Sequence, residues 1–73
     1  MYYNNVLIMV NIGKNIKRFR EKEGISQDKL SKLADISSNT VAKMELDNNP
    51  NPTIETLRKI AAALNVEVDD LIK

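Results

Sequence analysis

Three polar side chains, Ser38, Asn39 and Lys43, stand at a spacing that places them on one face of a short helix. An asparagine amide can pair with N6 and N7 of adenine, a lysine can donate to O6 and N7 of guanine, and a serine hydroxyl can donate or accept. Ala42 beside them is small enough to permit close approach. Such a face can contact base edges in the DNA major groove. An ordinary solvated helix face is the alternative, because polar residues cover the outer helices of any globular protein.

The stretch 25–46 predicts two short helices joined by a tight turn, which is a helix-turn-helix pattern. Ser26 stands as the N-cap of the first helix, and Ser37 stands as the N-cap of the second. Asp35 breaks the pattern between them. The apolar positions that recur at helical spacing are Leu30, Leu33, Ala34, Val41 and Met44.

Three further helices flank this pair. The first runs from about Ile12 to Glu23 and ends at Gly24. Thr53 caps a helix that closes at Asn65, and a short last helix follows, with Glu67 in its cap position. The apolar stripes of the first and fourth helices are Ile12, Ile16 and Phe19, and Ile54, Leu57, Ile60, Ala61 and Leu64. The sequence therefore predicts an all-α domain over residues 12–73.

Five segments occur in chain order between residues 12 and 73: RFREKEGISQ, LSKLADIS, NTVAKME, NPTIETLRKIAAALNV and VDDLI. No segment is specific alone, but together they resemble the Cro and phage-repressor-type helix-turn-helix family, often called the XRE family. The resemblance implies a five-helix, lambda-repressor-like domain. It further implies binding of double-stranded DNA as a dimer or monomer, with no catalysis and no cofactor.

The resemblance also implies roles for residues outside the base-reading face. Gln27 would contact the DNA backbone or brace a side chain of the second, recognition helix. Arg20 and Glu45 would form an internal ion pair between the first helix and the recognition helix. Helix N-termini typically face phosphates in this family. The candidate phosphate ligands are Gln27, Asn49, Asn51 and Thr53. The alternatives are a helix-compatible polar residue for the glutamine and turn chemistry for the loop residues.

The chain departs from the family at the end of the recognition helix. Leu46 and Asp47 stand where the family often has a basic or amide residue followed by glycine. The recognition face also contains no arginine, the commonest reader of guanine. We therefore expect a binding site that leans toward A·T pairs or is read partly through DNA shape.

Residues 1–11 lie outside the resemblance. Val6 to Val10 is an uninterrupted apolar run with β-branched residues, which predicts a strand. Two chains could pair such arms antiparallel and form a homodimer. A strand folded back on its own domain, or a disordered leader with Met9 as the true start, are the alternatives. Dimerisation through the last helix is the usual alternative.

Composition indicates one small soluble domain. The 73 residues are 42% hydrophobic and 29% charged, with no cysteine and no histidine, so we expect neither a disulfide nor a metal site. Neither a membrane span nor a signal peptide is evident, and we expect a cytoplasmic protein. Residues 1–32 carry a charge of +4 and residues 33–73 carry −3, which suits one side that faces phosphate.

The pattern as a whole predicts a sequence-specific DNA-binding transcriptional regulator, a dimeric repressor on a palindromic operator. An interaction module of the same fold, such as an antitoxin that binds a toxin or a bridging factor, is the alternative. The acidic C-terminal half and the apolar N-terminal arm would serve that second role. An enzyme is not expected, because histidine and cysteine are absent and no pair of acidic residues is clustered in a plausible cleft.

Overall fold

Residues 12–46 and 52–72 are described by a computed structural model, and they form five helices. The helices are α2 (Ile12–Lys22), α3 (Gln27–Ala34), α4 (Ser38–Leu46), α5 (Ile54–Leu64) and α6 (Val68–Ile72). The prediction of a five-helix, all-α domain is thus confirmed. The expected N-terminal strand lies outside the described residues.

The helix starts follow from local side-chain chemistry. Ser26 Oγ accepts the backbone N–H of Lys29 at 3.0 Å, and Thr53 Oγ1 accepts that of Thr56 at 3.1 Å. Ser37 Oγ accepts the N–H of Thr40 in the same way. Each hydroxyl satisfies a backbone donor that the helix itself leaves unpaired. The three predicted N-caps are confirmed.

Three helices end in the same left-handed turn. Gly24, Asp35 and Asn65 have positive φ, and each is followed by a residue whose N–H returns to the carbonyl five residues earlier. The residue with positive φ donates its own N–H to the carbonyl three residues earlier, and the two bonds together form the Schellman motif. Helix α2 consequently ends at Lys22, one residue before the predicted end. The turn at Asp35 leaves α3 and α4 separated by three residues.

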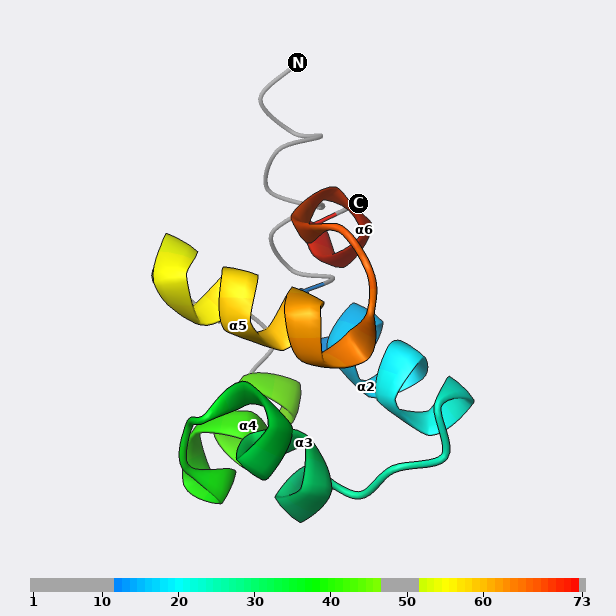
Figure 1. Cartoon of the computed structure of the whole chain (residues 1–73), viewed down its shortest axis with the longest axis vertical. Helices are drawn as coiled ribbons and strands as arrows, with labels where there is room; N and C mark the ends of the chain where they lie inside the picture. Colours follow the sequence, from blue (N-terminus) through cyan, green and yellow to red (C-terminus); the bar gives the residue numbers. More distant parts are fainter. Residues whose placement is uncertain (1–11, 47–51, 73) are drawn as a thin grey trace.

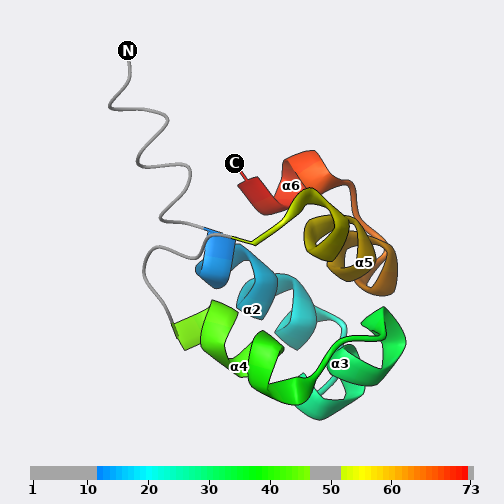
Figure 2. The same cartoon turned by 90° about the vertical axis from the view of Figure 1, so that its left-hand side faces the viewer.

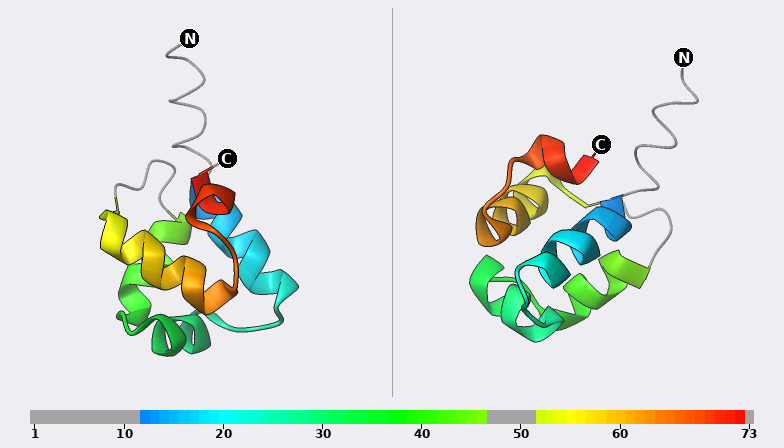
Figure 3. Two further views of the ribbon diagram at one scale, coloured as in Figure 1. Left: turned by 45° about the horizontal axis from the view of Figure 1, so that its top comes forward. Right: turned by 90° about the vertical axis from the view of Figure 1, so that its right-hand side faces the viewer.

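Helix α2 is the central element. It contacts α4 on one side and α6 on the other (Figure 1). Figure 2 shows α4 beside α2, with the two helices running in opposite directions, and the right-hand view of Figure 3 agrees. Helix α5 packs against α3 and α6. No helix in the described part of the chain is long and apolar enough to cross a membrane.

The apolar core draws on every helix. Its buried side chains are Ile12, Ile16, Leu30, Ala34, Val41, Met44, Leu57, Ile60, Ala61, Leu64 and Leu71. Two predicted stripe residues are exceptions: Leu33 is 53% exposed and Ile54 is 59% exposed. Buried Leu30, Ser31 and Ala34 centre the inward face of α3, and at about 100° per residue Leu33 falls beyond its edge. Ile54 is the first residue of α5, ahead of the first buried residue of that helix, Leu57.

One buried polar side chain ties the last helix to the core. Asn15 is 6% exposed, and its Nδ2 donates to the carbonyl of Leu71 at 2.9 Å. That carbonyl lies at the end of α6, where a helix leaves its acceptors unpaired. The bond therefore holds α6, a helix of only five residues, against α2.

Replacing Asn15 by alanine should lower the free energy of unfolding by about 1–3 kcal/mol, because the buried Leu71 carbonyl loses its donor. Urea unfolding followed by circular dichroism measures this. The control is Asn39→Ala, which gains the same helix propensity at an exposed site and should stay within about 0.5 kcal/mol. Equal effects of the two substitutions would show that Asn15 does not secure α6.

Candidate nucleic-acid interface

The outward face of α4 carries the predicted base-reading residues. Ser38, Asn39 and Lys43 are all exposed, and Ala42 among them is half-buried. Val41 and Met44 are buried on the opposite side, against the core. The structure therefore brings the three side chains together on one solvent-facing surface of one helix. Their contact with bases stays a prediction.

An ion pair fastens α4 to α2. Arg20 Nε donates to Glu45 Oε2 at 2.7 Å, and Arg20 Nη2 donates to Glu45 Oε1 at 3.0 Å. The side chains are 12% and 4% exposed, so both charges are largely removed from water. Arg20 Nη1 also donates to the carbonyl of Ile25 at 2.8 Å, in the connection before α3. One guanidinium thus binds α4 and fixes the path into α3.

The pKa of Arg20 is raised above its ordinary value. Its hydrogen bond to Glu45 raises the pKa most, burial lowers it, and the negative charges of Glu45 and Glu21 raise it further. A raised pKa in the folded state adds stability that is fully present below the ordinary pKa of an arginine side chain and is lost only as the pH rises above it. The guanidinium therefore stays charged throughout the neutral and acidic range, and its own titration causes no loss of stability there.

Gln27, in the first turn of α3, joins the same network. Its Nε2 donates to Glu45 Oε1 at 3.0 Å, so Glu45 is held from both α2 and α3. The family resemblance implied either bracing of the recognition helix or a contact with the DNA backbone, and this bond is the bracing geometry. A backbone contact by Gln27 stays a prediction.

A shallow pocket of about 390 Å³ opens between α2, α3 and α4. Its lining residues are Lys17, Arg20, Gln27, Ala42, Glu45 and Leu46. Since Arg20 and Glu45 neutralise each other, Lys17 is the lining cation that has no ion pair among the described residues. The pocket therefore offers one lysine beside two apolar side chains from the outer part of α4.

The loop candidates divide between described and undescribed residues. Asn49 and Asn51 lie outside the described residues. Thr53 is exposed, but its hydroxyl oxygen already accepts the Thr56 N–H as the cap of α5. Any contact between that hydroxyl and a DNA phosphate would therefore have to form in addition to this capping hydrogen bond.

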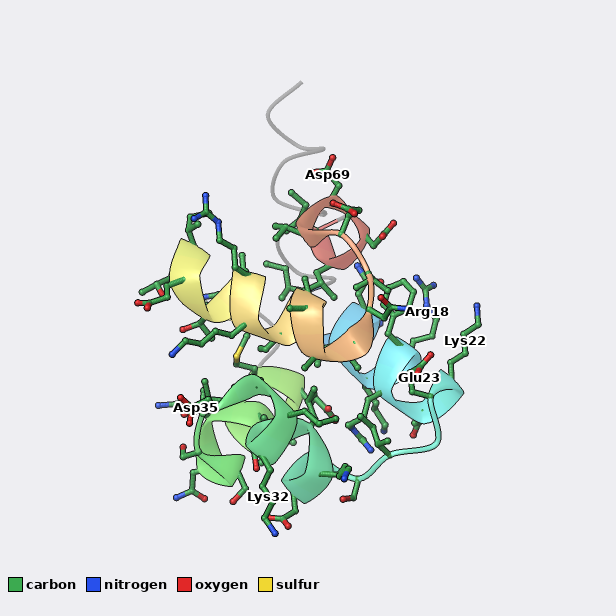
Figure 4. All side chains as sticks on the ribbon, viewed as in Figure 1. Arg18, Lys22, Glu23, Lys32, Asp35 and Asp69 are labelled. Carbon is green, nitrogen blue, oxygen red and sulfur yellow. The ribbon has the colours of Figure 1, made fainter. Side chains whose placement is uncertain are left out.

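The basic side chains of α2 point in different directions. Figure 4 shows Arg18 and Lys22 on the side of α2 that faces away from α3 and α4. Lys17 instead lines the pocket beside α4, and Arg20 is held by Glu45. Of these four basic side chains of α2, Lys17 is the one that lies beside α4 and has no ion pair among the described residues.

The sequence prediction did not include Lys17 or Leu46 in the site. Leu46 lies at the end of the same outward face and is 84% exposed. The sequence offered one signal that this position is unusual, since the family often has a basic or amide residue where this chain has Leu46. Lys17 could not be separated from the other basic residues of α2 without the packing of α4. Among the described residues, no group of three or more acidic side chains could hold a metal ion.

Comparison with known proteins agrees with this geometry. Residues 16–71 match the model of the helix-turn-helix family. The HTH-type transcriptional regulator SinR of Bacillus subtilis is 33% identical over 61 residues, which are 84% of this chain and 55% of SinR. The immunity repressor protein of Bacillus phage phi105 is 30% identical over 63 residues, 86% of this chain and 43% of that protein. The chain spans about half the length of the curated relatives it matches.

The likeness extends to a solved structure. The N-terminal DNA binding domain of SinR from Bacillus subtilis matches this structure with a TM-score of 0.83 and 31% identity. The match covers 88% of this chain and 93% of that domain. The helices that carry the candidate site therefore have the arrangement of a known DNA binding domain.

Removing the guanidinium should destabilise the fold strongly. Arg20→Ala leaves the Glu45 carboxylate almost buried without its cation, and we expect the free energy of unfolding to fall by about 3–5 kcal/mol. Thermal and urea unfolding measure the loss. Lys14→Ala, at an exposed position of the same helix, serves as control and should change stability by less than about 0.5 kcal/mol.

A double variant keeps this test informative if Arg20→Ala is largely unfolded. Arg20→Ala with Glu45→Ala leaves no unpaired charge, so it should be more stable than Arg20→Ala alone. A double variant that is less stable than the single one would contradict the ion pair as the source of the loss.

Proposed function

Because the chain belongs to the helix-turn-helix family, we propose that it is a sequence-specific DNA-binding transcriptional regulator. The observation that carries the proposal is the exposed face of α4 with Ser38, Asn39 and Lys43, on a helix held from behind by Arg20 and Glu45. An α-helix of this kind fits the major groove of B-DNA. A fixed helix presents its side chains to base edges without first having to be ordered.

The three exposed residues have distinct roles in this proposal. The Asn39 amide pairs with adenine, Lys43 donates to guanine, and the Ser38 hydroxyl adapts to either base. Gln27, Asn49, Asn51 and Thr53 hold backbone phosphates, together with the free N–H groups at the starts of α3 and α5. Base contacts provide specificity, whereas phosphate contacts set the position of the protein on the duplex.

We propose further that the chain acts as a repressor and as a homodimer. The name of the phage phi105 relative, an immunity repressor, supports repression. A dimer suits a domain of 62 residues (12–73) whose core is small, because association buries further surface. Residues 1–11, with the apolar run 6–10, are the proposed dimerisation arm. The cytoplasm is the proposed location, since the chain must reach DNA.

Selection of bound duplexes from a random DNA library at near-physiological salt tests this function. We expect an enriched inverted repeat with half-sites about 34–36 Å apart, one turn of the double helix, because a two-fold dimer presents two recognition helices. A single enriched half-site would contradict the dimer but not the regulator. No enrichment would contradict the regulator and favour the protein-interaction module.

Base reading by α4 has its own test. In the selected duplex, Asn39→Ala and Lys43→Ala should each lower the preference for the cognate base by about 5- to 150-fold, equivalent to 1–3 kcal/mol per specific contact. Helicity should be unchanged because both side chains are exposed. Lys29→Ala on α3 is the charge-matched control for Lys43, and it should leave the base preference intact. Full discrimination in the double variant would overturn the assignment of these residues.

A further inference from the structure

Leu46 is the last residue of α4, and the helical period directs its side chain along the centre line of the outward face, where a leucine contributes nothing to the core. It is 84% exposed, the largest exposed fraction among the large apolar side chains of the described residues. Seven residues, or about two helical turns, separate it from Asn39, so the two side chains point in nearly the same direction. The face that presents an amide near its start thus presents an isobutyl group at its end.

Neighbouring side chains make this end an apolar spot within a basic setting. Ala42 lies one turn before Leu46 and lines the same pocket. Lys17 from α2 borders that pocket, and Lys43 lies three residues before Leu46 on α4. An apolar partner protein would have to bury these ammonium groups, which is costly, whereas a polyanion carries the complementary charge.

We propose that Leu46, supported by Ala42, packs against the 5-methyl group of a thymine in the major groove. This inference rests on the proposed function. The thymine methyl is the apolar group that a base pair presents in the major groove. Seven residues span about 10.5 Å along a helix, and a helix in the major groove lies at an angle to the duplex axis. The thymine therefore lies in the same half-site as the adenine that Asn39 reads, a few base pairs from it.

The experiment removes the methyl group without changing base pairing. Each thymine of the selected half-site is replaced in turn by deoxyuridine, and Kd is measured for the full 73-residue chain. We expect one thymine per half-site whose replacement weakens binding about fourfold, the effect of one methyl group taken from water. In Leu46→Ala the same replacement should change Kd by less than about twofold.

A matched control separates a local contact from a general loss. Leu33→Ala removes an exposed leucine of α3, outside the recognition helix, and should keep the full fourfold effect of deoxyuridine. Circular dichroism verifies that both variants keep their helicity, which we expect because both side chains are largely exposed.

The outcomes distinguish this inference from the function on which it rests. If a duplex is selected but no thymine is sensitive, or if Leu46→Ala keeps the fourfold effect, Leu46 does not contact a methyl group and the regulator still stands. If no duplex is selected, the proposed function and the inference both fail.

Discussion

The ion pair between Arg20 and Glu45 determines where the recognition helix lies. Helix α4 has nine residues, too few to be stable alone, and it buries the side chains of Val41 and Met44. Glu45 adds a polar constraint to this apolar packing, because Arg20 of α2 and Gln27 of α3 both donate to its carboxylate. The orientation of the outward face thus depends on a network on the inner side of the helix.

Much of this architecture was predictable from local chemistry. Ser26 and Thr53 are N-caps because a hydroxyl there meets an unpaired N–H three residues later, whatever surrounds the helix. Leu33 and Ile54 were assigned to the apolar stripes but are exposed, because residue spacing gives the direction of a stripe and not the area that a neighbouring helix covers. Asn15 was not singled out, since its role depends on the Leu71 carbonyl 56 residues later.

The candidate site, too, was predictable from local sequence only in part. Exposure of Asn39 and Lys43 follows from the helical period of α4, so the face was predictable from residue types. The total positive charge of the N-terminal half was visible too, but its distribution was not. Arg20 is paired with Glu45, and Arg18 and Lys22 point away from α4, whereas Lys17 lies beside α4 and Lys43 lies on it. With a net charge of only +1, we expect weak attraction to non-specific DNA and a selectivity that depends on base contacts and shape.

The network also separates stability from recognition within one short helix. Glu45 and Met44 face inward and hold α4, whereas Asn39, Lys43 and Leu46 face outward and touch little of the domain. A substitution on the outward face therefore changes what the helix can contact without removing a core contact or the ion pair. An exposed leucine is tolerable in this position for the same reason: the fold neither gains from it nor suffers when it changes.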